Sequence, residues 1–578
     1  MKYPKMNKEL LPMKAHYFLW NAGTSPVTPF LSSYARQLGL SSVVVGFIYT
    51  VLPISGMLAK PIFGSIADRF HCQKILFLGA QLLTAAAFLA VFYSPKIETV
   101  RNVEMSCYNS TTSFVFHSTE SIDKCFLDPI KADRKWDKCE MNCGVRDPAT
   151  LCDKWSIEEY CHPDYTNQIS FTALVPKHET TLSNSSLIFK IDNITLSNGT
   201  TFSPPCSETS TPFLSTCKIN CEDYSLNEMI TETSVSDEEA YGLYQFWCVL
   251  IFMVIGWIGQ AVVVSVGDAI CFELLGDKPS HYGYQRLWGS LGWGVIAAIV
   301  GIVIDLSSRG KGQKDYTAAF YMAAIFIVLD FFTSIKISYS QKKVSTNICR
   351  DVALLLFNIR IIVFILWCIS VGICTGLMWQ FQFWLVEDLA KNQGCTGMVY
   401  VKTLEGLIQG VQTVLGEAPF FFFSGIIIKK LGHVNTMSLV LFAVGIRFLL
   451  YSVIPNPWYF LPIEISNGLT FGLFFACMAS YASIVAPSGT EATMQGLVGA
   501  VFEGIGVSAG SYLGGYCYQH FGGPLTFRYF GFGAIIVCFI HIAIQYLLRG
   551  SQNQYSTPEE TLEKIQRDDE KELTYLYS

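Results

Sequence analysis

Charge is scarce in this sequence. Asp, Glu, Lys and Arg together make up 15% of the 578 residues, whereas hydrophobic residues make up 51%. This balance excludes a string of soluble domains of the same length and predicts a protein that crosses the membrane many times. The charges gather in loops, in one long polar segment and in the C-terminal tail rather than in a basic patch, so no nucleic-acid partner is expected.

Motifs for catalysis are also lacking. The chain has no GxxxxGK(S/T) loop for nucleotide phosphates, no nucleophile elbow between a strand and a helix, and no HExxH zinc helix. ATP-driven pumping, serine hydrolysis and zinc proteolysis are therefore unsupported. We expect a protein that is not an enzyme and that holds no cofactor or metal.

Long apolar runs dominate what is present. Twelve runs approach the length of about 20 residues that a membrane-spanning helix needs. They cover residues 15–36, 42–66, 74–93, 242–266, 286–306, 317–338, 360–386, 402–428, 434–454, 458–485, 494–518 and 525–547. This pattern predicts an all-α membrane protein with twelve transmembrane helices in two six-helix halves.

The predicted organisation follows from the spacing of these runs. A large extracellular loop separates helices 3 and 4, and a polar linker separates the two halves. The predicted parts are the N-terminus with helices 1–3 (1–93), the extracellular loop (94–241), helices 4–6 (242–338), the cytosolic linker (339–359), helices 7–12 (360–548) and the cytosolic tail (549–578).

Lysine and arginine set the expected orientation. They gather in the N-terminal segment, at 69–74, in the linker and at 429–430, and the positive-inside bias assigns this side to the cytosol. The first run has no small-residue cleavage site, so it is predicted to be an uncleaved span. We expect a multi-pass protein of the plasma membrane with both termini in the cytosol, and an endolysosomal membrane is the alternative.

The segment 94–241 is then extracellular. It carries four glycosylation sequons, at Asn109, Asn184, Asn193 and Asn198. It also carries nine disulfide candidates, and a tenth lies in the predicted external link after helix 7; the ten are Cys107, Cys125, Cys139, Cys143, Cys152, Cys161, Cys206, Cys217, Cys221 and Cys395. Cys395 could tie this segment to the second half, remain a free thiol or bridge to another molecule. A zinc site at Cys139 and Cys143 is disfavoured because no matching histidine pair follows.

The connection between the second and third runs carries a recognisable motif. It reads GSIADRFHCQK, with Gly64, Asp68 and Arg69. This motif resembles the loop signature of the major facilitator superfamily, although His, Cys and Gln stand where that family has glycine and basic residues. The resemblance implies a latch between the halves that breaks when access switches. The alternative is a solvated turn.

Charged residues inside the spans are the best site candidates in the first half. Arg286 and Trp293 are seven residues apart, hence on one helical face, and Asp268 precedes Arg286 by eighteen residues. Because an isolated charge in a bilayer is costly, we expect an ion pair between Asp268 and Arg286. The stretch GYQRLWGSLGWGVIAAIVGI resembles the fifth span of lactose permease-type symporters, which implies that all three residues line a solute site. NKELLPMKAHYFLWNAG and GDKPSHYGYQRLWGSLGWG resemble the animal branch of major facilitator superfamily domain-containing protein 6 and its 6-like relatives.

The second half offers further candidates. Trp379, Gln380, Glu417, Arg447 and Asn467 are expected to line the same site. The resemblance aligns Arg447 with an arginine of the permease and puts Asn467 where that family has its coupling histidine; since asparagine does not titrate, that coupling pair is not carried over. Two carboxylates, Glu417 and Glu503, are candidates for proton coupling. The alternative is that these polar residues only hold the packing, or, for Glu405 and Glu464, that they lie near the outer surface in water.

These observations predict a secondary-active transporter of a small polar solute that works by alternating access and could be proton-coupled. The expected partners are a solute of unknown class and the lipid bilayer, and we expect a monomer. A second hypothesis is a cell-surface receptor or adhesion protein, because a polar segment of this length is usually functional or disordered. Its partner would be an extracellular protein bound by 94–241.

Overall fold

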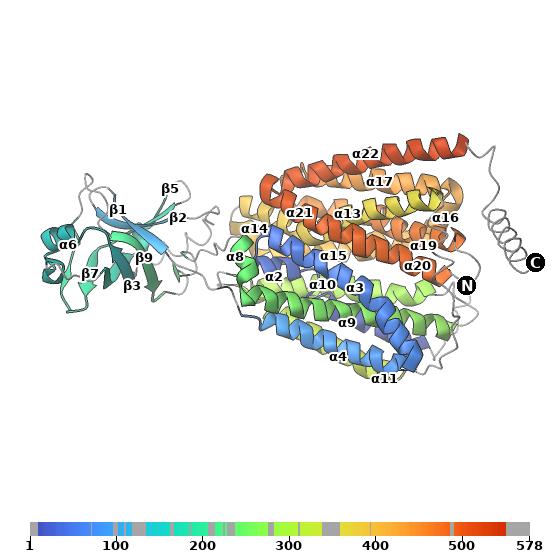
Figure 1. Ribbon diagram of the computed structural model, residues 1–578, viewed down its shortest axis with the longest axis horizontal. Helices are drawn as coiled ribbons and strands as arrows, with labels where there is room; N and C mark the ends of the chain where they lie inside the picture. The colour runs from blue at the N-terminus through green and yellow to red at the C-terminus, as the bar shows by residue number, and fades with distance from the viewer. Residues whose placement is uncertain are drawn as a thin grey trace, which may run out of the picture.

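The computed structural model describes residues 10–550 apart from short gaps. The gaps are 71, 96, 98–101, 109–110, 118–134, 162–166, 184–185, 206–213, 224–225, 228–229, 231–236, 276–281, 310–312, 338–358, 394 and 486–490. Some side chains within helices and strands also lie outside the described set, including those at Gly64, Asp68, Arg69, Cys107 and Cys395. A helical bundle makes up most of the molecule, and a β-sheet domain lies at one end of it (Figure 1).

The first half of the bundle contains long apolar helices. Its helices are α1 (Leu11–Thr24), α2 (Leu31–Gln37), α3 (Ser42–Phe70), α4 (Gln73–Phe92), α8 (Asp237–Gly242), α9 (Tyr244–Leu275), α10 (Tyr282–Ser307) and α11 (Thr317–Ile335). The predicted span 15–36 is not one helix, because α1 ends before a stretch that contains Pro26 and Pro29, and α2 begins after it. Proline lacks the amide hydrogen that a continuous helix needs, which explains the break.

The second half repeats this plan with more interruptions. Its α-helices are α13 (Ile359–Asn392), α14 (Cys395–Val399), α15 (Val401–Gly410), α16 (Ala418–Leu431), α17 (His433–Tyr451), α18 (Phe460–Glu464), α19 (Leu473–Val485), α20 (Glu491–Ala500), α21 (Ser508–Phe521) and α22 (Gly523–Gly550). A short 3-10 turn, η6 (Pro457–Tyr459), precedes α18. Three π-helical segments lie inside the spans: η5 (Val411–Glu417), η7 (Gly468–Gly472) and η8 (Val501–Val507). Such segments often mark functional sites.

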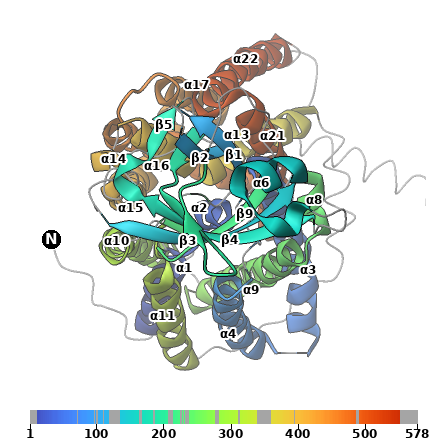
Figure 2. The same cartoon turned by 90° about the vertical axis from the view of Figure 1, so that its left-hand side faces the viewer.

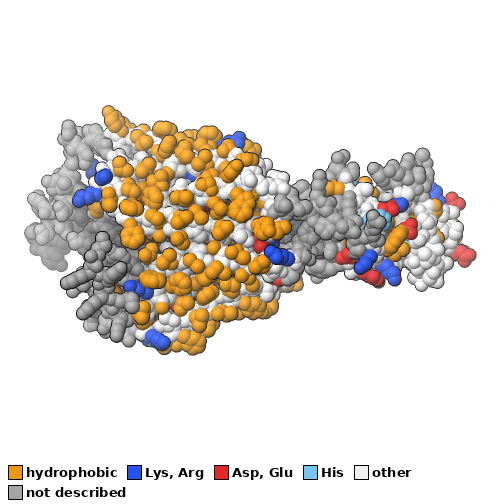
Figure 3. All heavy atoms as spheres, turned by 180° about the vertical axis from the view of Figure 1, so that it is seen from behind, with side chains coloured by type: hydrophobic (Ala, Val, Ile, Leu, Met, Phe, Trp, Pro, Cys, Tyr) orange, Lys and Arg blue, Asp and Glu red, His pale blue; other side chains and the backbone are white. Residues whose placement is uncertain are grey.

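The surface of the bundle is that of a membrane protein. Within the described residues, eleven helices are long and apolar enough to cross a membrane. Hydrophobic side chains are spread over the side of the bundle that Figure 3 shows. The predicted span that is missing from these eleven is the first, residues 15–36, which is broken into α1 and α2. The count of twelve continuous helices is therefore not reproduced.

The segment predicted as a loop contains a β-sheet domain. Its strands are β1 (Asn102–Tyr108), β2 (Thr111–His117), β3 (Trp136–Val145), β4 (Gln168–Pro176), β5 (Thr181–Ser183), β6 (Ser186–Lys190), β7 (Asn193–Leu196), β8 (Thr201–Phe202) and β9 (Leu214–Cys221). They form one nine-stranded sheet in the order β5-β6-β2-β1-β9-β3-β4-β7-β8, with antiparallel pairs. Helices of both halves lie behind this domain in Figure 2. The all-α prediction is therefore wrong for this segment.

Two disulfides fasten the centre of the sheet. Cys139 bonds to Cys221, and Cys143 bonds to Cys217, so that β3 is joined to its neighbour β9 at two directly paired positions. A third bond, Cys152–Cys161, closes the short helix α6 (Pro148–Trp155) onto the following turn. Side chains along β3 alternate between buried and exposed, as expected for a sheet with one packed face.

Candidate functional site

The first-half candidates form the predicted ion pair. Arg286 Nη1 on α10 lies 2.9 Å from Asp268 Oδ2 on α9, and Tyr17 on α1 donates its hydroxyl to Asp268 Oδ1 at 2.7 Å. The Asp268 side chain is 25% exposed and the Arg286 side chain 41% exposed. This pair is therefore held by three helices of one half and still presents polar atoms outside the protein core.

Trp293 lies two turns farther along α10 and reaches the other half. Its indole Nε1–H donates to Gln409 Oε1 of α15 at 3.1 Å. Trp293 therefore lies at the boundary between the halves, on the α10 face that the seven-residue spacing predicts it to share with Arg286.

The second-half candidates gather around Arg447. This buried guanidinium on α17 donates to Asn467 Oδ1 and Thr470 Oγ1, both at 2.7 Å, and forms an ion pair with Glu464. Tyr451 bonds to both Arg447 and Glu464. The suggestion that Glu464 is solvated near the outer surface is wrong, because the residue is fully buried by this network.

Glu417 joins the same network from the π-helical segment η5. Asn467 Nδ2 donates to Glu417 Oε1 at 2.9 Å. The wide turn of η5 places Glu417 at the C-terminal end of a segment that also contacts η7. A carboxylate, an amide and an arginine are therefore connected in one chain of hydrogen bonds.

Two predicted residues of α13 differ in their surroundings. Trp379 packs against Phe471 and Phe502, with ring centroids 5.9 and 6.4 Å apart, and stays 39% exposed in the middle of its helix. Gln380 is buried, and among the described contacts it is Gln382 that reaches the network, donating to Glu464 Oε1 at 2.5 Å. Gln382 was not among the predicted site residues.

The predicted coupling residue Glu503 takes part in a contact between the halves. Its Oε2 lies 2.9 Å from Lys60 Nζ of α3, and both side chains are partly exposed. The motif residues Gly64, Asp68 and Arg69 belong to the last turns of α3, where the side chains fall outside the described set. The latch that they were expected to form stays a prediction.

A cluster that sequence reasoning did not foresee joins the halves at the end that carries the sheet domain. We call it the inter-half charge cluster; it consists of Arg36, Glu387, Asp388, Lys402 and Glu405. Arg36 of α2 bonds to Asp388 at 3.0 Å, and Lys402 of α15 pairs with Glu387 and with Glu405, the latter at 2.9 Å. Glu405 is fully buried, so the alternative that it lies in water near the outer surface is wrong. The adjacent acidic residues Glu387 and Asp388 near the end of α13 were the feature of the sequence that could have indicated this cluster.

Backbone contacts lie beside this cluster. A Cβ added to Gly301 of α10 would meet Lys402 O of α15 at 2.1 Å, and one added to Gly515 of α21 would meet Ser42 O of α3 at 2.4 Å. Glycine at these two positions therefore lets helices of opposite halves approach closely.

The hollows described by the structure have different characters. A cavity of about 10 Å³ beside Arg447 is lined by Cys374, Met378 and Phe471, among others. Its volume is about that of one water molecule, which is too small for a solute. A wider hollow of about 400 Å³ lies on the sheet domain, lined by Lys138, Glu140, Thr172, Thr195, Asn220, Cys221 and Glu222.

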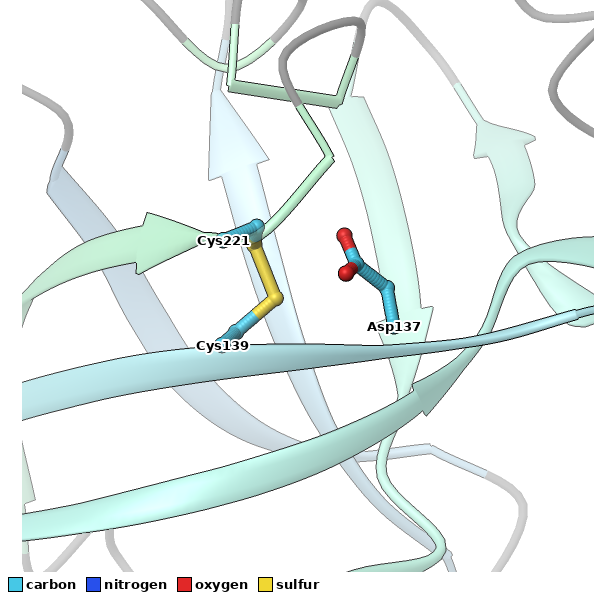
Figure 4. Close-up of side chains that lie close together, drawn as sticks. All are labelled: Asp137, Cys139 and Cys221. Carbon is cyan, nitrogen blue, oxygen red and sulfur yellow. A yellow bond between two sulfur atoms is a disulfide. The ribbon is translucent and has the colours of Figure 1, made fainter.

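The predicted modification sites are only partly described. Asn193 lies in β7, and the exposed Asn198 lies between β7 and β8, whereas Asn109 and Asn184 fall outside the described residues. Six of the ten disulfide candidates are bonded, while the side chains of Cys107, Cys125, Cys206 and Cys395 are not described. Asp137 lies beside the Cys139–Cys221 pair (Figure 4), and because these two sulfurs are bonded to each other they are not thiolate ligands for a metal.

Comparison with known families decides what kind of bundle this is. The family description "MFS_1 like family" matches residues 10–529, which is most of the chain. The chain belongs to the MFS_1 like family.

Relatives within and around the MFS_1 like family agree. Major facilitator superfamily domain-containing protein 6-like protein B of Xenopus laevis is 22% identical over 549 residues, covering 89% of this chain and 87% of the relative. Maltose permease of Geobacillus stearothermophilus is 22% identical over 301 residues, covering 51% of this chain and 70% of the permease. The crystal structure of the nucleoside transporter NupG superimposes with a TM-score of 0.58 at 12% identity, covering 95% of this chain and all of that one.

Membership in this family, together with the apolar helices, makes the chain a multi-pass membrane protein of the transporter type, not an enzyme. The likeness to NupG shows the shared fold alone. The resemblance to the major facilitator superfamily and to its domain-containing protein 6-like branch is thereby confirmed.

Proposed function

We propose that this chain is a secondary-active transporter that moves a small polar solute between its two halves by alternating access. The observation that carries the proposal is that each half holds a group of hydrogen-bonded polar residues. In the first half the group is Asp268 and Arg286, and in the second half it is Glu417, Asn467 and Arg447. Trp293 of the first half donates a hydrogen bond to Gln409 of the second half and so connects the two halves. Charged residues inside a membrane bundle commonly mark a solute or ion pathway.

Closure at one end supports the alternating-access part of the proposal. Within the inter-half charge cluster the halves meet through Arg36, which pairs with Glu387 and Asp388, and they also meet through the backbone contacts of Gly301 and Gly515, all at the sheet-domain end. Transport requires these contacts to separate so that the site opens there. In this proposal the sheet domain is extracellular, both termini are cytosolic and the structure is the state closed to the outside.

The chemistry of the site favours a neutral, polyhydroxylated solute. The charges of Arg286 and Asp268 cancel, as do those of Arg447 and Glu464, so neither pair requires a charged group on the solute. The lone pairs and N–H groups of such pairs suit hydroxyl groups, and an exposed Trp379 offers a flat apolar surface for a ring. The maltose and nucleoside named for the relatives have this chemistry. Glu417, bonded to neutral Asn467, is the candidate for proton coupling at this site.

Ligand-dependent stability of the purified protein tests the proposal. A ligand at 100 times its dissociation constant stabilises the folded state by about 2.7 kcal/mol, so thermal unfolding in detergent is measured against sugars, nucleosides, amino acids and organic acids. We expect a sugar or nucleoside to stabilise the native protein, and Asp268→Asn and Arg286→Gln to abolish the effect. Lys430→Gln, which removes an exposed lysine at the end of α16, is the matched control and should keep it. Stabilisation that survives both site variants would refute this placement of the site.

The hollow on the sheet domain supports a second candidate function, the binding of an extracellular protein. Lys138, Glu140 and Asn220 offer charged and amide groups on adjacent strands β3 and β9. Charge reversal, Lys138→Glu with Glu140→Lys, should abolish capture of such a partner at the cell surface and leave solute stabilisation unchanged. If the reversal leaves partner capture intact, the hollow is not the binding surface.

A further inference from the structure

A buried cluster in the first half has no part in the site described above. His16 of α1 directs Nδ1 at Asp330 of α11, 2.9 Å from Oδ1 and 3.0 Å from Oδ2. Gln81 of α4 donates to Asp330 Oδ2 at 2.9 Å and to Ser334 Oγ at 3.0 Å. All four side chains are buried, and residues 314 apart in sequence are brought together.

Among the described side chains, only a protonated His16 would balance the charge of Asp330. In the part of the chain that the structure describes, no lysine or arginine forms an ion pair with Asp330. If His16 is neutral, a full negative charge is buried in a membrane bundle, which is costly. Gln81 Oε1 is in addition a buried acceptor without a donor among the described groups. A proton is the smallest ligand that brings one positive charge.

Other titratable groups on the surrounding helices have their own partners or lie outside the cluster. Asp268 is engaged by Arg286 and Tyr17, and Lys74 donates to the backbone oxygens of Ile335 and Ile337. The charged and titratable groups on α1, α4, α9, α10 and α11 near the cluster are Lys14, Tyr17, Lys74, Asp268, Cys271, Arg286 and Lys336.

We propose that His16 and Asp330 form a proton-binding site in the first half of this protein. In the deprotonated state the neutral imidazole donates Nδ1–H to the carboxylate. A proton from solution adds to the Nε2 lone pair, which gives an imidazolium paired with Asp330 and leaves every other bond unchanged. His16 lies five residues from the start of α1 and Asp330 five residues from the end of α11, so the site is about 8 Å from the end opposite the sheet domain.

The geometry links this proton to the proposed solute site. His16 precedes Tyr17, which bonds to Asp268, and Gly267 precedes Asp268. A Cβ on Gly267 would lie 3.2 Å from His16 Nε2, so the ring atom that takes the proton abuts α9 next to Asp268. A change in the charge or position of the imidazole therefore acts on both sides of the Tyr17–Asp268 bond. The proton site itself stands on the cluster, whereas its use in transport rests on the proposed function.

Nitrogen NMR of the histidine rings tests proton binding without any solute. Full-length protein in nanodiscs, labelled with ¹⁵N in its nine histidines, is titrated between pH 4.5 and 9, and His16→Gln identifies the His16 signals by their loss. We expect His16 to titrate and Asp330→Asn to move its midpoint to lower pH, because the imidazolium loses its carboxylate. His541 is the matched control: it is buried, bonds to Ser438 at 3.0 Å, and should not respond to Asp330→Asn.

Each result is decisive. A His16 ring that keeps one tautomer over the whole range, or a midpoint unmoved by Asp330→Asn, overturns the proposal. A response to added sodium or potassium at constant pH, in place of a response to pH, would make this a metal-ion site and also overturns it. If His16→Gln does not fold, Gly267→Ala assigns the signal, since the added methyl contacts Nε2. Titration of His16 combined with solute stabilisation that is independent of pH would leave the proton site intact and refute only its coupling to transport.

Discussion

Lys402 is the residue whose removal should release the halves at the sheet-domain end. Its side chain is 1% exposed, and its ammonium group pairs with the carboxylates of Glu387 and Glu405. In Lys402→Met the side chain keeps its length and loses its charge, so two buried carboxylates lose their shared partner. Arg36 still lies 3.5 Å from Glu387, but Glu405 has no other basic partner among the described contacts.

The expected magnitude follows from the burial of this pair. Removing one partner of a buried ion pair costs about 3–5 kcal/mol, because the other charge stays buried and uncompensated. The cost applies only while the halves are joined, since separation lets water reach Glu405. Taking about 4 kcal/mol and 1.36 kcal/mol per factor of ten, the equilibrium between joined and separated states shifts roughly a thousandfold. A population that is about 99% joined would become about 90% separated.

Electron–electron distance measurements read this shift directly. Spin labels are carried by non-canonical amino acids at two exposed positions at the sheet-domain end, Leu306 near the end of α10 and Val453 just after α17, and leave the 19 native cysteines untouched. We expect the distance between them to lengthen in Lys402→Met. A second label pair, at Ile335 and Leu431 on the opposite end, should become closer as that end closes.

Two controls separate charge from packing. Adding Glu405→Gln to Lys402→Met removes the stranded carboxylate and should restore the short distance, since Glu387 keeps Arg36. Lys430→Met removes an exposed lysine and should change nothing. An unchanged distance in Lys402→Met, or the same opening in the double variant, would refute the reasoning that an unpaired buried charge drives separation.

Three further predictions concern the sheet domain. Replacing Cys143 and Cys217 by serine should destabilise it by about 2–5 kcal/mol, seen as faster hydrogen exchange in β3 and β9; unchanged exchange would mean that the bond is dispensable. Burial raises the pKa of Asp137 above its usual range, so the native carboxyl holds its proton more tightly than the unfolded one and stability falls as pH rises through that raised value. Asp137→Asn should flatten this fall in hydrogen exchange between pH 4 and 7, and an equal slope in both proteins would contradict it. Asn198→Gln should remove one glycan-dependent mass step on glycosidase treatment, and an unchanged number of steps would show that the sequon is unused.

Local patterns predicted those parts of the fold that depend on composition. Apolar runs located the spans, and the eighteen-residue spacing placed Asp268 opposite Arg286 because the two helices are antiparallel neighbours joined by a short link. Cys139, Met141 and Cys143 alternate with polar residues along β3, a pattern that is typical of a strand. The sequence prediction used the cysteines only as disulfide candidates. The break between α1 and α2 was visible as Pro26 and Pro29.

Contacts between distant helices were beyond such patterns. His16 and Asp330 are 314 residues apart, and neither one alone distinguishes a paired group from a residue near the membrane surface. The π-helical segments that carry Glu417 and Glu503 cannot be recognised from the spacing of apolar residues in the sequence. One widened turn changes the direction in which all following side chains of the helix point. The alternative that Glu405 is solvated is wrong because the first turns of α15 pack closely against α10 of the other half, a contact that the sequence does not show.

Which charges can serve a solute depends on whether their partners lie in the same half. If the halves move as rigid bodies, the pairs Asp268–Arg286 and Arg447–Glu464 persist in both states, because each pair belongs to one half. The pairs Lys402–Glu387 and Lys402–Glu405 lie within the second half, so separation exposes them to water, whereas Arg36–Asp388 and Trp293–Gln409 bridge the halves and must break. Breaking the last contact frees the indole N–H of Trp293 and the amide of Gln409, one on each side of the proposed site. In the proposed transport cycle, a solute that bonds to both would replace the lost contact and so would couple its own binding to the movement of the halves.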